Sequence, residues 1–372
     1  MSTGIPEQID PRPWMELART ATAHDVIRSL NAESPTVSDL AILLSPAGDS
    51  ALEPMAQRAL HLTRRHFGST IALYVPLYLS DYCSGGCAYC GFAADRRIPR
   101  HRLDRDQAIR EMDSLKAMGF EEILMLTGER TPQADTPFLL DNVRLAAERF
   151  SSVTIETFPM AVDEYRTLSD AGCVGMTLYQ ETFDPKVYRQ AHRWGPKQDY
   201  AARIDAPNRA LHGGLRHVGL GVLLGLANPL FDALALFLYI GQLRKTFWQA
   251  GISVSFPRIR PQAGGYTPNH TVDERLLARI IWAFRICLPD AHLNLSTREG
   301  PSFRDGMAGV GISKMSAASR TTVGGYSENE SCKNGQFAVS DERDIATFCA
   351  MLRAHKLDPV FKNWDAVYRT HS

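Results

Sequence analysis

The sequence predicts an α/β protein: a closed (β/α)8 barrel of the TIM type, with an N-terminal helical extension and a C-terminal helical tail. Three observations predict this fold. Eight short β-rich segments alternate with helical patterns, which is typical of parallel strands. Hydrophobic residues make up 44% of the 372 residues and charged residues 22%, which favours one large buried core. The length suits a single barrel, and no repeat of fixed period interrupts it.

Residues 1–70 are expected to form the N-terminal helical extension. In TVSDLAILLSP, Ser38 is a candidate N-cap and the helix should stop before Pro46. The pattern EPMAQRALHLTRRHFG predicts another helix that ends at Gly68, because glycine readily adopts the backbone conformation at a helix C-terminus. The first residues, MSTGIPEQIDPRPW, contain no apolar signal-peptide core.

The barrel is expected over residues 71–320. Its eight predicted strands are residues 71–80, 121–128, 152–158, 175–180, 217–224, 252–259, 291–297 and 311–317. Residues 104–119 and 273–287 show clear helical patterns, whereas the helix after STREGPSFRDG has the weakest one. The apolar run from Asn228 is too short to cross a bilayer and contains Asp232, so it predicts a buried helix.

Residues 321–372 are expected to form a tail packed on the barrel. Ile345, Phe348, Cys349 and Leu352 follow the i, i+3, i+4, i+7 spacing of a helix with one buried face. In such barrels the functional groups lie at the C-terminal ends of the strands.

Charge and cysteine content narrow the functional classes. Lys plus Arg and Asp plus Glu both number 41, which argues against broad binding to nucleic acid or to an acidic membrane. Seven cysteines without an export signal favour a reducing cytoplasm, where thiols serve as metal ligands or core residues.

Three cysteines, Cys83, Cys87 and Cys90, lie in a glycine-rich loop directly after the first predicted strand. A zinc site would need a fourth ligand, such as His66 or His101, and the usual finger spacing is missing. Incidental packing is disfavoured, because thiols in such a loop would be exposed and oxidisable. A four-iron cluster held by three thiolates would leave one iron open to a small molecule, as a catalytic zinc keeps one position open.

The spacing CxxxCxxC of Cys83, Cys87 and Cys90, with Tyr89 before the last cysteine, resembles the signature of the radical SAM superfamily. The resemblance implies a radical SAM barrel with one 4Fe-4S cluster. In this superfamily the open iron chelates S-adenosylmethionine (SAM), and one-electron reduction then yields methionine and a 5′-deoxyadenosyl radical. It also implies that Tyr89 and Phe92 surround the adenine.

Further motifs resemble the SAM-binding segments of that superfamily. LTGER implies that Gly128 permits close backbone approach and that Glu129 binds the SAM amino group, since a carboxylate suits an ammonium. YQETF implies that Glu181 accepts hydrogen bonds from the ribose or reaches the substrate. KQDYAARIDAP implies that Arg203 pairs with the SAM carboxylate, unless it is a solvated helix arginine. GLGVLLGL implies that Gly221 lies against adenine, although periodicity alone predicts an ordinary buried strand.

Motifs along nearly the whole chain resemble the aromatic amino acid lyases of this superfamily: YVPLYLSDYC, CGF, YQETF, SFPRIRP, LSTRE and PVFKNWDAVY. They are most similar to the tyrosine lyases of thiazole biosynthesis. The resemblance implies cleavage of the Cα–Cβ bond of L-tyrosine to 2-iminoacetate (dehydroglycine) and p-cresol for thiamine biosynthesis. It implies thiazole synthase and a flavodoxin- or ferredoxin-type reductant as partners. A related tryptophan lyase that forms an indole acid is the alternative.

The resemblance also implies residues that bind the substrate. Arg298 in STRE is expected to hold the amino acid carboxylate, because a planar guanidinium suits that group. Ser316 and Ser319 in KMSAASR are expected to add hydrogen bonds, and Arg258 in SFPRIRP either joins the catalytic site or braces the barrel. An iron–sulfur electron carrier gains nothing from an open iron, and a degenerate scaffold should have lost these pocket residues.

The remaining cysteines bear on the number of clusters. A sister tyrosine lyase of hydrogenase maturation carries a second cluster on a C-terminal extension with a CxxC pair. Here Cys332 and Cys349 form no such pair, whereas Cys173 and Cys287 lie in apolar contexts typical of packing. One cluster is therefore predicted, with release of dehydroglycine as the product.

Overall fold

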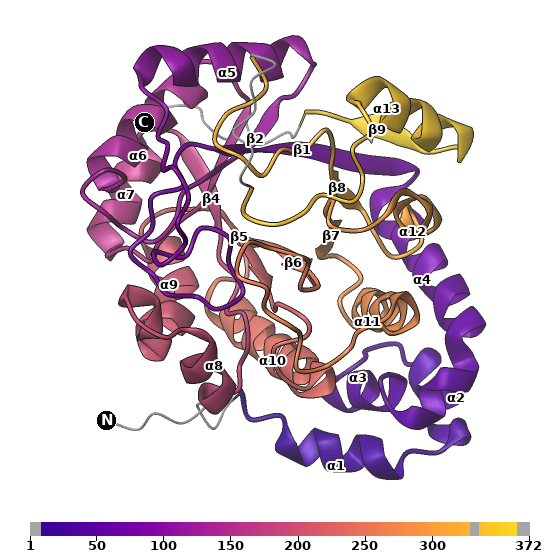
Figure 1. Cartoon of the computed structure of the whole chain (residues 1–372). Coiled ribbons are helices and arrows are strands. Elements are labelled where there is room, and N and C mark those ends of the chain that lie inside the picture. The colour runs from indigo at the N-terminus through magenta and orange to yellow at the C-terminus, as the bar shows by residue number, and fades with distance from the viewer. Residues whose placement is uncertain (1–8, 328–334, 363–372) are drawn as a thin grey trace.

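Eight parallel strands close into a barrel in the computed structural model, which describes residues 9–327 and 335–362 (Figure 1). The barrel closes because β1 pairs with β8 through residues 72–74 and with β2 through residues 75–78. The (β/α)8 fold and all eight predicted strands are confirmed. Their bounds are β1 Thr70–Tyr78, β2 Glu122–Leu126, β3 Ser152–Glu156, β4 Cys173–Thr177, β5 His217–Gly221, β6 Gly251–Ser255, β7 His292–Leu295 and β8 Lys314–Ser316.

Helices alternate with these strands and cover the outside of the barrel (Figure 1). Six of the eight helices begin at an Asp or Asn cap, as where the Asp104 carboxylate accepts the Gln107 N–H at 2.8 Å. The helix with the weakest sequence pattern, α12, has only seven residues. Their bounds are α5 Arg105–Ala117, α6 Thr136–Ala147, α7 Val162–Asp170, α8 Pro185–Ala191, α9 Tyr200–His212, α10 Pro229–Thr246, α11 Glu274–Cys287 and α12 Pro301–Met307.

The N-terminal extension lies beside α10 and α11, on the outer face of the barrel (Figure 1). It comprises α1 Arg12–Thr20, α2 Ala23–Leu30, α3 Val37–Leu43, a 3-10 turn Pro46–Ala51 and α4 Leu52–Phe67. The predicted N-cap Ser38 is wrong by two residues, because Thr36 precedes α3 and its N–H and hydroxyl donate to Asp39 at 2.8 and 2.9 Å. The predicted stop at Gly68 is confirmed, with a φ of 61° that favours glycine.

After β8 the chain crosses the C-terminal end of the barrel. Residues 335–341, here called the tail strap, are tied to three loops by backbone hydrogen bonds: Gly91 N–H to Gln336 O, Ala338 N–H to Pro261 O, and Ser340 N–H to Thr297 O. The predicted tail helix is confirmed as α13, Ile345–Ala354, with Phe348, Cys349 and Leu352 buried. The predicted domain boundaries at residues 70 and 320 stay predictions, and Cys332 lies outside the described residues.

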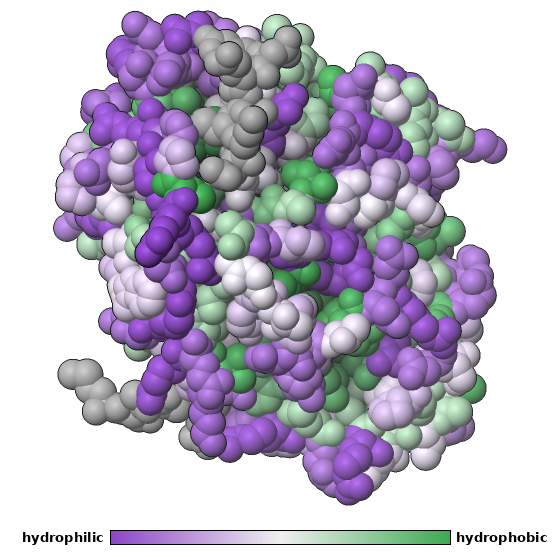
Figure 2. Space-filling view, viewed as in Figure 1, coloured by the Kyte–Doolittle hydropathy of each residue, from purple (hydrophilic) through white to green (hydrophobic). Residues whose placement is uncertain are grey.

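A ninth strand, β9 Asp358–Val360, pairs in parallel with the start of β1 and was not predicted. It has three residues and includes Pro359, so it carries no alternating pattern and can serve only at an edge. On the face shown in Figure 2, hydrophilic side chains predominate and hydrophobic ones appear in small patches. Among the helices of the described residues, none is long and apolar enough to cross a membrane.

Candidate active site

The cysteine loop follows β1, at the C-terminal end of the barrel, and its three thiols line one cavity. The Cys83 Sγ accepts backbone N–H groups from Gly85 at 3.4 Å and from Glu129 at 3.3 Å. The Cys90 Sγ accepts the Phe92 N–H at 3.4 Å. Backbone N–H donors of this kind stabilise thiolate ligands and tune the reduction potential of a cluster that these ligands hold.

Burial raises the pKa of the Cys83 thiol to about 11 and that of Cys87 to about 12. These thiols therefore keep their protons at neutral pH unless a strongly positive centre binds them as thiolates. The zinc alternative finds no support in the two histidines weighed for it. His101 lies 3.6 Å from the Asp81 carboxylate, and His66 lies on α4. Within residues 9–327 and 335–362, no three His, Cys, Asp or Glu side chains converge on a single ion.

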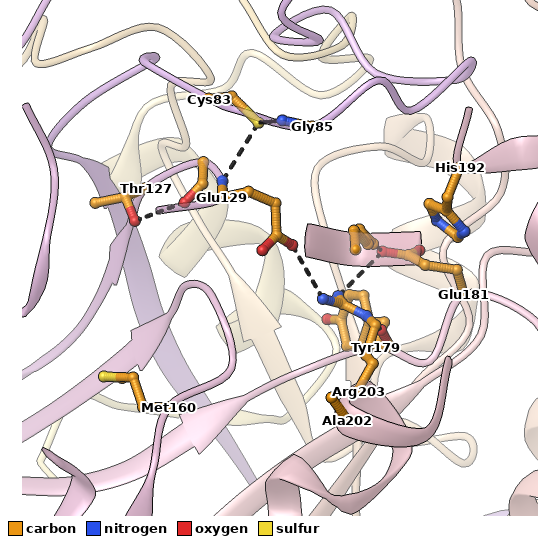
Figure 3. A network of polar contacts seen from close by, with 12 residues as sticks. Cys83, Gly85, Thr127, Glu129, Met160, Tyr179, Glu181, His192, Ala202 and Arg203 are labelled. Atoms are coloured by element: carbon orange, nitrogen blue, oxygen red, sulfur yellow. Dashed lines mark hydrogen bonds and ion pairs between the residues drawn. The ribbon is translucent and has the colours of Figure 1, made fainter. Parts of the chain in front are cut away.

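Buried charges form a network beside the cysteines (Figure 3). The Arg203 guanidinium lies 3.3 Å from the Glu129 carboxylate and 3.5 Å from that of Glu181, and its Nε donates to the Tyr179 carbonyl at 2.9 Å. All three charged side chains are at most 10% exposed, which contradicts a solvated Arg203. The second Glu129 oxygen is buried and has no hydrogen-bond partner among the described residues, so it is suited to an additional donor such as an ammonium.

Lys197 completes this network and was missed from the sequence. Its Nζ donates to Glu181 at 2.6 Å. Burial alone would raise the pKa of Glu181, but the charges of Lys197 and Arg203 outweigh it and lower that pKa. Glu181 also has a φ of 70°, which is rare outside glycine and typical of residues held in place at functional sites.

Tyr89 and Phe92 both line the cysteine cavity. The Tyr89 hydroxyl lies 2.7 Å from His192 Nε2, and His192 Nδ1 lies 2.7 Å from the Tyr188 carbonyl. Burial and the nearby cations lower the pKa of His192 well below its usual range, so the ring is neutral. Because a carbonyl only accepts, Nδ1 carries the proton and Tyr89 donates to Nε2.

Gly221 does not line this cavity, and the proposal that it forms the wall against adenine stays a prediction. It borders a separate small space between the barrel and its outer helices. A Cβ on Gly221 would come within 2.7 Å of the Tyr179 ring and 2.5 Å of the Ser255 carbonyl. The glycine therefore makes room for Tyr179, which does line the cysteine cavity.

A second cavity lies within the barrel, beside the first. Its lining includes Arg298, whose guanidinium stacks 3.3 Å from the centre of the Phe337 ring in the tail strap and has no acidic partner among the described residues. The Ser316 Oγ accepts the Thr297 N–H at 3.3 Å. The Ser319 hydroxyl is buried and finds no hydrogen-bond partner within residues 9–327 and 335–362.

Seven residues line both cavities and form what is here called the shared wall: Leu126, Glu156, Tyr179, Pro257, Arg298, Gln336 and Phe337. Glu156 is the last residue of β3 and was missed, although its position at a strand end is the signal that the barrel rule provides. Gln336 and Phe337 were also missed, because nothing in the tail sequence indicates that it crosses the barrel.

Arg258 lines neither cavity, and its contacts favour the second of its two predicted roles, which is to brace the barrel. Its Nε donates to the buried Glu299 at 3.0 Å, and its Nη1 donates to the Val272 carbonyl at 2.9 Å. Arg258 therefore braces the barrel. Arg260 pairs with the same carboxylate at 2.7 Å and does line the cysteine cavity.

Comparisons with known proteins confirm the predicted resemblance. Residues 77–229 match the Radical SAM superfamily, and residues 255–358 match the Biotin and Thiamin Synthesis associated domain. The chain is 42% identical over 346 residues to the 2-iminoacetate synthase of Escherichia coli (strain K12), covering 93% of this chain and 92% of that protein. A crystal structure of HydG, a maturase of the FeFe-hydrogenase, superposes with a TM-score of 0.91 at 28% identity, covering 99% of this chain and 82% of that one. The chain therefore belongs to the 2-iminoacetate synthase family of radical SAM enzymes.

Proposed function

We propose that this enzyme cleaves the Cα–Cβ bond of L-tyrosine to 2-iminoacetate and p-cresol, and so supplies the thiazole branch of thiamine biosynthesis. The observation that carries the proposal is Arg298 on the shared wall. Its guanidinium lies beside both cavities without an acidic partner among the described residues, which suits the carboxylate of an amino acid substrate. The relative of 42% identity is named for the same product.

The radical SAM family implies a 4Fe-4S cluster and SAM, and the described residues fit both. Cys83, Cys87 and Cys90 would hold the cluster. When bound, the cluster and SAM supply the radical that removes a hydrogen atom from the substrate amino group. Arg203 would pair with the SAM carboxylate, and the unpartnered oxygen of Glu129 would accept from its amino group.

The other proposed contacts follow from the same cavities. Gly128 would allow SAM to approach the backbone, and Glu181 would accept from its ribose. Tyr89 and Phe92 would border the adenine, whereas Ser316 and Ser319 would donate to the substrate from the second cavity.

A single cluster is part of the proposal. Cys173, Cys287 and Cys349 are buried members of the main hydrophobic core, and none of them lines the cysteine cavity. None of the six described cysteines is in a disulfide, which suits a reducing compartment such as the cytoplasm. We further propose a flavodoxin- or ferredoxin-type electron donor, and a thiazole synthase that receives the product.

The test is turnover by the anaerobically reconstituted enzyme with SAM and a one-electron reductant. Tyrosine should give p-cresol together with glyoxylate, the hydrolysis product of 2-iminoacetate, whereas tryptophan should give no indole acid. The Cys87→Ala variant is the control and should form no 5′-deoxyadenosine. An indole acid from tryptophan, with tyrosine inert, would overturn the proposal.

A further inference from the structure

We propose that Glu156 is the residue that binds the α-ammonium group of the substrate and accepts a proton from it. This inference rests on the proposed function, because it assumes an amino acid in the second cavity. It gives a role to a carboxylate that none of the family motifs in the sequence includes.

The placement of Glu156 is the first argument. Of the seven residues on the shared wall, Glu156 is the one carboxylate and Arg298 is the one cation. Glu156 ends β3 and Arg298 follows β7, so the two come from opposite sides of an eight-stranded barrel. In the proposed function, SAM occupies the cysteine cavity and tyrosine occupies the second cavity. The substrate atom that reacts must therefore lie at the shared wall between them.

Charge complementarity is the second argument. An α-amino acid carries a carboxylate and an ammonium on the same carbon, and the shared wall offers one charge of each opposite sign. With the carboxylate at Arg298, a carboxylate partner for the ammonium leaves no charge of the bound substrate unpaired. The ring then falls among the remaining lining of the second cavity, which includes Tyr74, Ser255 and Asn294.

The other carboxylates that line the cysteine cavity already have roles. Glu181 pairs with Lys197 and Arg203, whereas Glu129 pairs with Arg203 and offers its second oxygen to the SAM amino group in the proposed function. The side chain of Glu156 makes no hydrogen bond or ion pair with any described residue and is partly exposed to the cavities. Among the described residues of this region, it is therefore the carboxylate that remains available to the substrate.

The chemistry requires a proton acceptor at this position. The substrate ammonium gives one proton to the Glu156 carboxylate: the N–H bond breaks, its electron pair stays on nitrogen, and an O–H bond forms. The ammonium and the carboxylate become neutral in the same step, so the net charge in the barrel does not change. A neutral amine remains, and its N–H bond is the one from which a hydrogen atom is removed in the proposed reaction.

The surroundings bring the pKa of Glu156 close to neutral pH. Burial, and next the charge of Glu181, raise its pKa to about 7, while Arg298, Lys197 and Arg203 lower it. Such a group exchanges protons readily with a bound amine at working pH. The titratable and charged groups that face it come from several elements: Tyr74 and Tyr78 of β1, Tyr179 and Glu181 after β4, Lys197, Arg203 of α9, and Arg298 after β7.

The test is equilibrium binding without reductant, so that no turnover occurs, to enzyme loaded with cluster and SAM. The ligands are L-tyrosine, 3-(4-hydroxyphenyl)propanoate, which lacks the amino group, and L-phenylalanine, which lacks the hydroxyl. Glu156→Gln should weaken tyrosine and phenylalanine by at least about 30-fold, the factor that corresponds to 2 kcal/mol. It should leave the propanoate unchanged. The matched control is Glu148→Gln, the same change on an exposed side chain, and should leave all three ligands unchanged.

Two other outcomes overturn the inference. Loss of tyrosine and propanoate binding with phenylalanine unaffected would mean that Glu156 recognises the phenol hydroxyl. Unchanged binding of all three ligands would mean that it contacts none of them. Failure of the unsubstituted enzyme to bind tyrosine would instead count against the proposed function.

A measurement on the unsubstituted enzyme keeps the test decisive if Glu156→Gln fails to load its cluster. As pH falls below about 7, protonation of Glu156 should weaken tyrosine binding more than propanoate binding. Parallel pH profiles for the two ligands would overturn the inference, because any titration in the SAM site affects both alike.

Discussion

Gly128 provides a sharp test of the cofactor cradle, because a single methyl group there meets main-chain atoms. A Cβ added at Gly128 would lie 2.6 Å from the Cys83 Cβ, 2.6 Å from the Tyr82 carbonyl oxygen and 3.0 Å from the Cys83 Cα. None of these atoms ends a flexible side chain that could rotate away. Gly128→Ala should therefore push the loop after β2 away from the cysteine loop.

The size of the effect follows from these contacts. Ordinary contacts at a Cβ are 3.4–4 Å, so the two loops must separate by at least about 0.8 Å. That shift would break the hydrogen bond from the Glu129 N–H to the Cys83 Sγ, which is already 3.3 Å long. Overpacking of this kind costs about 1–3 kcal/mol, which corresponds to roughly a five- to 150-fold weaker hold on the cluster.

The assay is the rate and extent of iron loss to a chelator under anaerobic conditions, together with the melting temperature of the apo protein. The matched control is Gly241→Ala on the exposed face of α10, where an added Cβ meets nothing within 4 Å. That variant should keep its cluster and gain up to about 1 kcal/mol, because alanine favours a helix interior. Equal iron retention by the two variants would refute the reasoning.

Three further predictions concern single groups. Arg298→Ala should keep the cluster and 5′-deoxyadenosine formation but weaken tyrosine binding by about 30-fold or more, measured by anaerobic titration; unchanged affinity removes it from the carboxylate role. Glu299→Gln leaves Arg258 and Arg260 without their buried partner and should lower the free energy of unfolding by about 3 kcal/mol in urea, whereas a loss below 1 kcal/mol contradicts the brace. Burial raises the pKa of Asp232 to about 7, so the folded state binds more protons than the unfolded one and stability should fall as pH rises from about 4 to 7. Asp232→Asn should flatten that fall in melting temperature, and parallel curves would exclude the burial effect.

The fold could be predicted because its signals are local. Strands of a parallel barrel are buried on both faces and read as short apolar runs between polar turns, so all eight were found from the sequence. β9 and the tail strap could not be found in this way. Their positions depend on backbone hydrogen bonds to residues far away in the chain, such as Gly91 N–H to the Gln336 carbonyl, and such pairings leave no periodic pattern.

In the candidate site, too, residues with a local sequence signal were found and residues that depend on distant contacts were missed. Cys83, Cys87 and Cys90 share one loop, so their spacing alone reveals them. Glu156 had a signal in its position at a strand end, whereas Lys197 becomes a functional candidate only when the barrel brings distant loops together. The sequence left two roles open for Arg258, because it shows that this residue ends a predicted strand but not which way its side chain points. In the fold it turns to Glu299, 41 residues away in the sequence.

The tail strap makes the two cavities depend on one another. Gln336 accepts the Tyr78 hydroxyl at 2.7 Å, its carbonyl accepts the Gly91 N–H at 3.0 Å, and its amide lies 3.8 Å from the Cys90 Sγ. The next residue, Phe337, carries the Arg298 guanidinium on its ring. A displacement of the strap would thus remove a donor from Cys90, a proposed cluster ligand, and release the proposed carboxylate anchor in one movement. Gln336 and Phe337, which make these two contacts, both belong to the shared wall. The tail is therefore structurally part of the site, even though almost all the motifs that revealed the chemistry precede it in the sequence.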